Sequence, residues 1–285
     1  MIRSVRRVTT LCALGAALSA LAACAPHEAT RAPLPAPSAT ARVSPMAGPP
    51  TLAPGPAGLT PVFEHGPRGR DKAVALTFDA DMTADQGPRA ARGERFDNPG
   101  LVAALRELKV PATVFITGRW AEEYPSQARA IGRNPLFEVA NHSYSHYAFT
   151  EDCYGLPTVG EERMRVDVKR AYAALRKVGI RDAMPYFRFP GGCYDRRALK
   201  ALSPVGVTAV QWDVVSGDAF ATDARAVAQE VLDGVRAGSV VVLHCTLSAA
   251  PTTERVVRSV VPELRDRGFR FVKVSELIGA SGGRA

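Results

Sequence analysis

Short apolar segments alternate with longer amphipathic ones through residues 73–272, and this alternation limits the possible folds more than any other feature. Short apolar runs are typical of buried strands, and apolar residues at spacings of three and four are typical of helices. The predicted strands are 73–78, 112–117, 136–140, 186–189, 207–212, 239–244 and 269–272. The predicted helices are 101–108, 121–131, 161–178, 196–202, 223–236 and 253–266. Seven strands that alternate with helices imply a parallel sheet covered by helices, either closed as a barrel or open and doubly wound.

Polar side chains capable of catalysis follow the predicted strands at one end. They are Asp79 and Asp81 after the first strand, His142 and His146 after the third, Arg188 at the end of the fourth, Asp213 after the fifth and His244 at the end of the sixth. The carboxyl ends of parallel strands converge on one face, where the active sites of β/α folds are built. We therefore expect these side chains to share one site.

His142 and His146 are four residues apart and follow the predicted strand 136–140. If a helix begins there, both imidazoles lie on one face of it and can bind the same divalent cation. A catalytic zinc ion usually has three protein ligands and one water, so a carboxylate from elsewhere would complete the set. The alternative is a chance pair of histidines on a solvated helix.

The first 24 residues have the pattern of an export signal. Arginines precede an apolar stretch at 11–21 that is too short to span a bilayer, and Leu21-Ala22-Ala23-Cys24 matches a bacterial lipobox. This predicts lipidation of Cys24 and anchoring of the protein to a membrane by its N-terminal lipid. The alternative is an ordinary signal peptide cleaved near Ala23, and in both cases the chain leaves the cytosol.

Residues 25–67 are rich in Pro, Ala, Gly, Ser and Thr and have no apolar periodicity, so we expect a disordered linker. Residues 68–280 are long enough for one catalytic domain, followed by a short tail at 281–285. The formal net charge of +8 suits anionic envelope polymers, although an ordinary solvated surface is the better explanation of it. No basic run is interleaved with aromatic residues, so nucleic acid is not an expected partner, and nothing in the sequence predicts a protein partner.

Three cysteines, Cys153, Cys193 and Cys245, lie in the predicted domain. An exported chain can form a disulfide, and an odd number leaves at least one thiol free. We favour Cys153 with Cys193, because both lie in loops that follow the candidate catalytic segments, although the other pairings remain open.

Four segments resemble, in order, the motifs of the polysaccharide deacetylase family, which is carbohydrate esterase family four with the NodB-homology domain. They are Thr77-Phe78-Asp79, Asn141-His142-Ser143-Tyr144-Ser145-His146, Arg188-Phe189-Pro190-Gly191-Gly192 and Val242-Leu243-His244. The resemblance covers roughly residues 70–278. It implies an irregular (β/α)7 barrel that removes acetyl groups from N-acetylated sugars with a divalent metal held by Asp-His-His. Zinc is the expected metal, with cobalt, manganese and nickel as alternatives.

The resemblance also implies a role for each matching residue. Asp79 would be the general base, and His244 the general acid that protonates the departing amine. Arg188 would orient Asp79 by a charge-assisted hydrogen bond. Pro190 and Gly191 would lie at the acetyl group, where the Gly191 N–H would stabilise the oxyanion.

The chain departs from the family pattern at three places. Where the family has adjacent aspartates, this chain has Asp79-Ala80-Asp81, and we expect Asp81 to be the third metal ligand because residues i and i+2 of an extended chain point the same way. The alternative is a weaker site with two histidines and water. Gly191 stands where the family has Tyr. Val215 stands where the family has an Asp that tunes the catalytic His, so Asp213 is predicted to do so, with Asp218 as second choice.

The sequence as a whole predicts a membrane-anchored, metal-dependent deacetylase that acts on a cell-envelope or extracellular glycan, with peptidoglycan amino sugars favoured. One alternative is an O-acetyl esterase on the same scaffold. Another is a non-catalytic lipoprotein that binds glycan through a degraded metal site.

Overall fold

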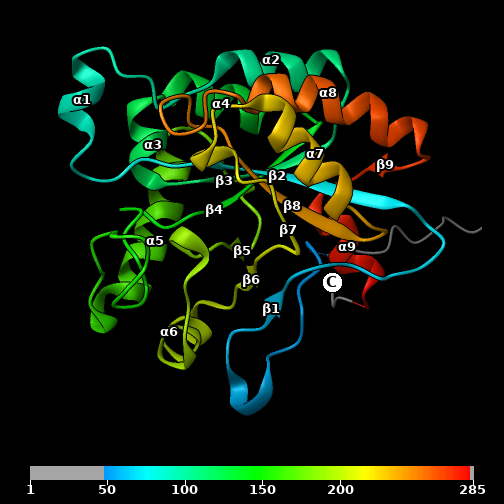
Figure 1. The fold of residues 1–285 in the computed structure, drawn as a ribbon. Helices are drawn as coiled ribbons and strands as arrows, with labels where there is room; N and C mark the ends of the chain where they lie inside the picture. The colour runs from blue at the N-terminus through cyan, green and yellow to red at the C-terminus, as the bar shows by residue number, and fades with distance from the viewer. Residues whose placement is uncertain (1–47, 283–285) are drawn as a thin grey trace, which may run out of the picture. The chain divides into compact units, whose positions relative to one another are not determined.

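A computed structural model describes residues 48–282, which form one parallel sheet with helices packed around it (Figure 1). The strands are β1 (Val62–Phe63), β2 (Ala73–Ala80), β3 (Ala112–Ile116), β4 (Phe137–Asn141), β5 (Tyr186–Phe187), β6 (Thr208–Val210), β7 (Val214–Val215), β8 (Ser239–His244) and β9 (Arg270–Phe271). The α-helices are α1 (Gly87–Ala91), α2 (Pro99–Glu107), α3 (Gly118–Glu123), α4 (Pro125–Gly132), α5 (Glu161–Lys177), α6 (Arg196–Leu202), α7 (Ala224–Gly234), α8 (Thr253–Asp266) and α9 (Val274–Ala280). Short 3-10 helices are η1 (Pro56–Gly58), η2 (Pro190–Gly192), η3 (Ser203–Val205) and η4 (Asp218–Phe220).

The sheet has the order β1-β6-β5-β4-β3-β2-β8-β7, with β9 pairing to the beginning of β2. Every pair of strands is parallel. Because β6 pairs with β5 and β7 pairs with β8, residues 211–213 carry the chain from one side of the curled sheet to the other. The predicted irregular (β/α)7 barrel is confirmed, and β5, β6 and β7 are strands of only two or three residues.

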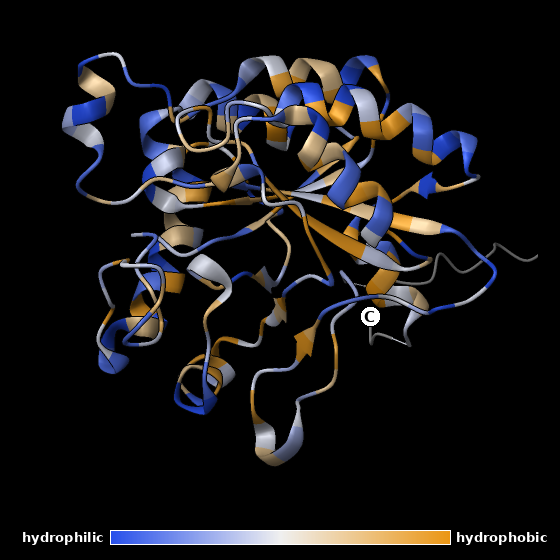
Figure 2. Cartoon of the chain, in the orientation of Figure 1, coloured by the Kyte–Doolittle hydropathy of each residue, from blue (hydrophilic) through white to orange (hydrophobic). Residues whose placement is uncertain are grey.

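Apolar residues fill the strands at the centre of the sheet and the inner faces of the helices. All eight residues of β2 are buried, as expected for a parallel strand covered on both faces. Figure 2 shows β2 and β8 as hydrophobic along most of their length, whereas the neighbouring helices alternate hydrophobic and hydrophilic residues. Burial of both faces fixes the register, and the register decides which side chains appear at the carboxyl edge.

One predicted helix is two helices in the structure. The sequence predicts a single helix over 121–131, but α3 ends at Glu123 and α4 begins at Pro125. Tyr124 between them has φ −118° and ψ 56°, which is not helical. The cause is Pro125, since a proline disfavours helical backbone in the preceding residue and suits the first position of a new helix.

The predicted linker is partly packed against the domain. Residues 1–47, which include the predicted signal, Cys24 and most of the linker, lie outside the described residues. Residues 48–67 instead contact the barrel: β1 pairs with β6, and the Tyr186 hydroxyl donates to the Pro50 carbonyl at 2.7 Å. The predicted boundary between linker and domain, after residue 67, therefore lies too far along the chain, because residues 48–67 already pack on the domain. Within 48–282, no helix has the length and apolarity needed to cross a bilayer.

The favoured disulfide is confirmed, because Cys153 and Cys193 are bonded. Their Cα atoms are 6.0 Å apart, and the bond joins the loop after β4 to the loop after β5. Cys245 is a buried free thiol, and burial raises its pKa to about 12.

Candidate active site

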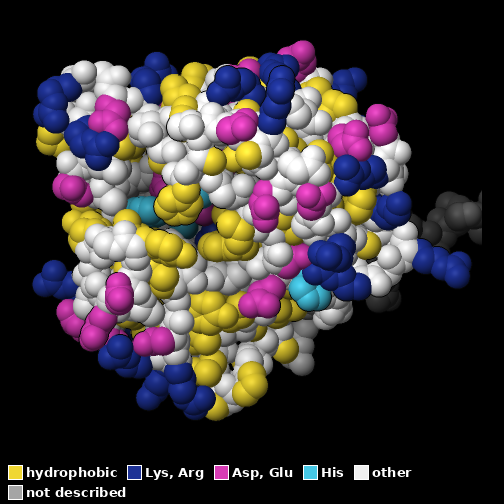
Figure 3. All heavy atoms as spheres, in the orientation of Figure 1, with side chains coloured by type: hydrophobic (Ala, Val, Ile, Leu, Met, Phe, Trp, Pro, Cys, Tyr) yellow, Lys and Arg dark blue, Asp and Glu magenta, His cyan; other side chains and the backbone are white. Residues whose placement is uncertain are grey.

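Most of the predicted site residues meet at the carboxyl edge of the sheet, with the exception of Asp213. Asp79 on β2 is the register partner of His244 on β8, and the last residue of β4 precedes His142. These side chains line a cleft of about 530 Å³ together with Asp81 and His146. Figure 3 shows histidine at the floor of a hollow on this face, with hydrophobic side chains around it. The parallel register therefore explains why residues far apart in sequence share one cleft.

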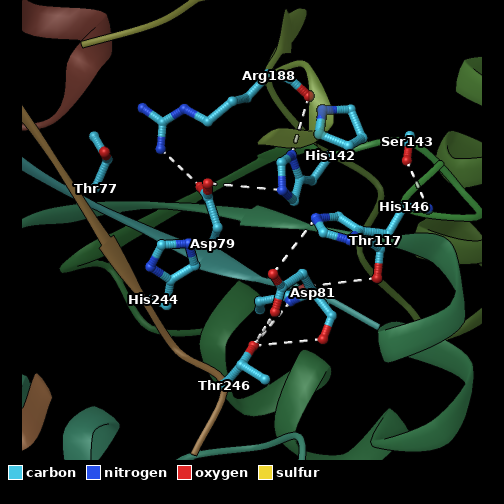
Figure 4. A network of polar contacts seen from close by, with 12 residues as sticks. Thr77, Asp79, Asp81, Thr117, His142, Ser143, His146, Arg188, His244 and Thr246 are labelled. Atoms are coloured by element: carbon cyan, nitrogen blue, oxygen red, sulfur yellow. Dashed lines mark hydrogen bonds and ion pairs between the residues drawn. The ribbon is translucent and has the colours of Figure 1, made fainter. Parts of the chain in front are cut away.

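Asp81 lies one residue beyond β2, on the same side of the chain as Asp79. Ala80 between them is fully buried and packs into the hydrophobic core. The Asp81 segment is held on both flanks by threonines (Figure 4). Thr117 accepts a hydrogen bond from the Met82 N–H, while the Thr246 hydroxyl accepts from the Asp81 N–H and donates to the Asp81 carboxylate. The carboxylate thereby points toward the histidines.

His142 and His146 lie on a turn, so the conditional expectation of a helix after the strand is wrong. Ser143 and His146 have positive φ, 71° and 56°. The Asn141 side chain accepts from the Ser143 N–H, and the Ser143 hydroxyl accepts from the His146 N–H. Such local bonds compete with helix formation. The two imidazole rings are nevertheless brought together, with centroids 4.9 Å apart.

Asp81, His142 and His146 offer three ligand atoms that all lie within 4.8 Å of one another. The His142 Nδ1–H donates to the Arg188 carbonyl at 3.0 Å, which leaves Nε2 free to bind a cation. Burial lowers the pKa of His146 to about 4, so this imidazole is neutral at pH 7, as a metal ligand must be. One carboxylate and two imidazoles suit zinc and other first-row divalent metals. The residues present therefore fit the expected metal.

Asp79 is bound to Arg188, and both side chains are buried. Arg188 Nη1 donates to Asp79 Oδ1 at 2.7 Å, while its other nitrogens donate to the carbonyls of Val210 and Gln211. Burial opposes ionisation of Asp79, but the Arg188 charge and the nearby histidines outweigh it and lower the pKa of Asp79. Asp79 Oδ2 is 3.6 Å from His142 Nε2, so this ionised carboxylate lies beside the candidate metal ligands.

His244 is oriented by Asp218, not by Asp213. The His244 Nδ1–H donates to Asp218 Oδ1 at 2.7 Å, and the buried Asp218 also accepts from the His244 N–H and the Thr253 hydroxyl. Burial would lower the pKa of His244, but the Asp218 charge and hydrogen bond outweigh it and raise the pKa to about 9. His244 is therefore protonated at pH 7.

The prediction that Asp213 tunes His244 is wrong, because the chain crosses from one side of the curled sheet to the other between β6 and β7. Asp213 instead binds Arg68 at 2.6 Å, the Ser239 hydroxyl at 2.9 Å and the Val240 N–H at 2.7 Å. Ser239 and Val240 lie at the beginning of β8, at the end of the strand opposite His244. Asp218 follows the left-handed Gly217 and returns to the catalytic edge.

Gly191 lines the cleft in a left-handed conformation, with φ 64°. A Cβ atom there would lie 2.5 Å from the Cys153 sulfur, so the conformation and the disulfide both favour glycine. The preceding Pro190 is buried and begins the short 3-10 helix η2.

Thr117 and Thr246 were not predicted from the sequence. Thr117 immediately follows β3, and Thr246 lies two residues after His244, the last residue of β8. In an extended segment, residues i and i+2 point to the same side of the chain. That spacing was the available signal for Thr246.

A parallel β/α barrel with an Asp-His-His cluster, a buried carboxylate and a protonated histidine at its carboxyl edge has the architecture of a metal-dependent hydrolase. The family model for polysaccharide deacetylase matches residues 66–210. The chain belongs to the polysaccharide deacetylase family, and its predicted assignment to this enzyme family is confirmed.

Named relatives match a larger part of the chain than the family model does. The chain is 29% identical over 199 residues to a chitooligosaccharide deacetylase of Azorhizobium caulinodans, covering 66% of this chain and 89% of that one. It is 25% identical over 211 residues to a peptidoglycan-N-acetylglucosamine deacetylase of Bacillus cereus, covering 73% and 89%. A crystal structure of a peptidoglycan N-acetylglucosamine deacetylase in complex with a hydroxamate-type benzamide shares the fold, with a TM-score of 0.66, 24% identity and coverage of 79% and 96%.

Proposed function

We propose that the protein removes N-acetyl groups from a cell-envelope or extracellular glycan, with peptidoglycan amino sugars as the favoured substrate. The observation that carries the proposal is the pairing of opposite protonation states in one cleft. Asp79 has a lowered pKa and is ionised, His244 has a raised pKa and is protonated, and both line the cleft with the Asp81-His142-His146 cluster. Groups whose environments push their pKa values apart are suited to act as base and acid.

Asp81, His142 and His146 would hold the metal. When bound there, a divalent cation such as zinc supplies Lewis-acid polarisation of the acetyl carbonyl and lowers the pKa of water. Asp79 takes a proton from the attacking water, and the Arg188 guanidinium keeps the carboxylate oriented and ionised until then. The Gly191 N–H donates to the developing oxyanion. His244 then gives its Nε2 proton to the departing amine while Asp218 stabilises the imidazolium.

The elevated pKa of His244 favours an amide substrate over an ester. An amine leaves only after it is protonated, whereas an alcohol leaving group needs less help from an acid. The buried Asp218 carboxylate, which accepts several hydrogen bonds, keeps His244 charged. An O-acetyl esterase would have less need of this arrangement, and a non-catalytic glycan-binding protein would need neither base nor acid.

We further propose that the protein is exported and anchored to a membrane through lipid on Cys24, facing the periplasm or the cell wall. Support comes from the order of positive, apolar and lipobox residues in the first 24 positions. A lipid anchor would place the cleft within reach of envelope glycans. Mass spectrometry of the mature N-terminus tests it: a diacylglyceryl-modified Cys24 is the expected result, and a free N-terminus near Ala25 would contradict it.

The enzymatic proposal is tested by acetate release from purified peptidoglycan and from N-acetylglucosamine oligomers. The wild type should release acetate, and Asp79→Asn and His244→Gln variants should each lose at least about a hundredfold in kcat. Equal turnover by the wild type and both variants would contradict the assigned roles. Parallel assays with an acetate ester separate the two enzyme classes, because His244→Gln should impair amide hydrolysis far more than ester hydrolysis.

A further inference from the structure

The turn that carries the proposed oxyanion donor consists of two successive glycines, Gly191 and Gly192, here called the oxyanion turn. Both have positive φ, 64° and 72°. Glycine adopts this conformation without steric cost, but it has more backbone freedom to lose than any other residue. The direction of the Gly191 N–H therefore depends on the groups that hold the oxyanion turn from outside.

Two contacts limit where the oxyanion turn can lie. Cys193 directly follows it and is bonded to Cys153. On another side, a Cβ atom on Gly192 would lie 2.4 Å from the Trp212 ring, so this ring packs directly on the backbone of the turn. A covalent tether at the next residue and an apolar contact fix a position, but neither sets the direction of a peptide group.

Gln211 supplies a directional contact. Its Nε2 donates to the Gly192 carbonyl at 2.7 Å. A carbonyl oxygen can only accept, so the NH2 end of the side-chain amide must face it. Gln211 is 7% exposed, and this hydrogen bond is therefore shielded from competition with water. The bond fixes the orientation of the peptide group that ends the oxyanion turn.

The backbone around Gln211 is itself held in place and also supports Arg188. The Gln211 N–H donates to the Phe63 carbonyl at 2.8 Å. The carbonyls of Val210 and Gln211 accept from Arg188 Nε and Nη2 at 3.1 and 3.3 Å. Residues 210–211 thus contact both the guanidinium that orients the proposed base and the turn that presents the proposed oxyanion donor.

The side chain of Gln211 is not explained by packing alone. Its Oε1 is buried and has no hydrogen-bond partner among residues 48–282. Burial of an unpaired amide oxygen costs free energy, which a methionine of similar length would avoid. What glutamine provides here and methionine cannot is the donor to the Gly192 carbonyl. The retained amide is therefore best understood through the oxyanion turn.

We propose that Gln211 is a positioning residue for the deacetylation reaction. By holding the Gly192 carbonyl, it keeps the Gly191 N–H directed at the acetyl oxygen while negative charge develops there. Gln211 is not among the residues that line the cleft, so it acts through the oxyanion turn and not on the substrate. This inference rests on the proposed deacetylase function and adds a residue to its machinery.

Gln211→Met tests the proposal, because it keeps the length of the side chain and removes its donor. Loss of a whole oxyanion-hole donor typically lowers kcat by about 10²- to 10³-fold. The variant keeps the Gly191 N–H and only loosens its direction, so kcat for the N-acetylglucosamine tetramer should fall by about tenfold. KM should change by less than about twofold, since the affected hydrogen bond is realised mainly in the transition state.

A second readout separates positioning from a general structural effect. The methylphosphonamidate analogue of N-acetylglucosamine has a tetrahedral phosphorus whose oxygen mimics the oxyanion. Its inhibition constant, measured with purified full-length protein and added zinc, should rise by the same factor as kcat/KM falls. Wild-type kcat in a folded Gln211→Met variant would overturn the proposal. A loss of kcat with unchanged affinity for the analogue would also overturn it.

Two further variants complete the experiment. Gln127→Met is the matched control, because Gln127 is a partly buried glutamine on α4 that donates to Asp97 outside the cleft. It should leave kcat, KM and analogue affinity unchanged. Gln211→Asn keeps the amide on a side chain one methylene shorter, and it should lose kcat and analogue affinity as Gln211→Met does. This variant decides the question if urea denaturation shows that Gln211→Met is unfolded, and wild-type values for it would overturn the proposal.

If the wild type releases no acetate, the proposed function fails and calorimetric titration with the analogue decides the role of Gln211 separately. Weaker binding by the two Gln211 variants than by the wild type and Gln127→Met would then support the positioning of the Gly191 N–H. Equal binding by all four proteins, or none by any of them, would overturn it.

Discussion

Asp79 and His244 occupy paired positions on the neighbouring strands β2 and β8, at the carboxyl edge of the sheet. Each is bound to a buried partner of opposite charge, Asp79 to Arg188 and His244 to Asp218. The two ion pairs drive the pKa values in opposite directions, lowering that of Asp79 and raising that of His244. One register in one parallel sheet thus places a base beside an acid.

Asp218→Asn should shift the pH profile of kcat/KM. His244 acts as acid only while protonated, so wild-type activity should fall as the pH rises past about 9. Without the Asp218 charge, the pKa of His244 falls and the alkaline limb moves to lower pH. The matched control is Asp213→Asn, which removes a carboxylate that binds Arg68 and Ser239 instead. A shift in the Asp213 variant with none in the Asp218 variant would contradict the assignment.

The raised pKa of His244 also links stability to pH. The folded value of about 9 exceeds the ordinary value of 6.5, so the interaction with Asp218 stabilises the fold fully below pH 6.5. That contribution should disappear as the pH rises through about 9. Urea denaturation at pH 6 and pH 10 should show a larger stability difference for the wild type than for Asp218→Asn.

Arg188→Met should destabilise the fold and impair catalysis together. Arg188 is fully buried and compensates the buried Asp79, so its removal leaves a carboxylate without its counter-charge. We expect a loss of about 3–5 kcal/mol in the free energy of unfolding and a raised pKa of Asp79, which moves the acid limb of activity upward. Arg68→Met breaks a partly exposed pair with Asp213 and should cost about 1 kcal/mol or less. Similar losses in both variants, measured by urea denaturation, would refute this account.

Thr246→Val should weaken metal binding without removing a ligand. The Thr246 hydroxyl donates to the Asp81 carboxylate and accepts from the Asp81 N–H, so it orients the ligand. Loss of such a supporting contact typically lowers metal affinity about 10- to 100-fold. Thr246→Ser keeps the hydroxyl and should bind zinc as the wild type does. Competition with a chromophoric chelator measures the zinc affinity of both variants. A Thr246→Val variant that binds zinc as tightly as the wild type would show that Asp81 needs no such support.

Replacing both Cys153 and Cys193 by alanine should destabilise the fold. The disulfide closes a loop with a sequence separation of 40, for which loop entropy predicts a contribution of about 4 kcal/mol. Chemical denaturation of the purified variant measures the loss. A variant as stable as the wild type would contradict the prediction.

The sequence predicted the alternation of strands and helices because periodicity and burial are local properties. It also placed Asp79, His142 and His244 at the carboxyl edge, since each directly ends or follows a strongly apolar strand. It could not distinguish Asp213 from Asp218, because that choice depends on how residues 211–213 cross between β6 and β7. The packing of residues 48–67 was missed for a similar reason, since β1 is too short to leave a periodic pattern.

The most direct test of the central claim is acetate release from an N-acetylglucosamine tetramer, measured with bound metal for the wild type and Asp81→Ala before and after chelation. The account predicts that the wild type binds one divalent metal, loses activity to a chelator and regains it with zinc. Asp81→Ala should bind metal far more weakly and release little acetate. Metal binding and turnover by Asp81→Ala equal to those of the wild type would contradict a site built on Asp81, and wild-type turnover that survives complete metal removal would contradict a metal-dependent deacetylase.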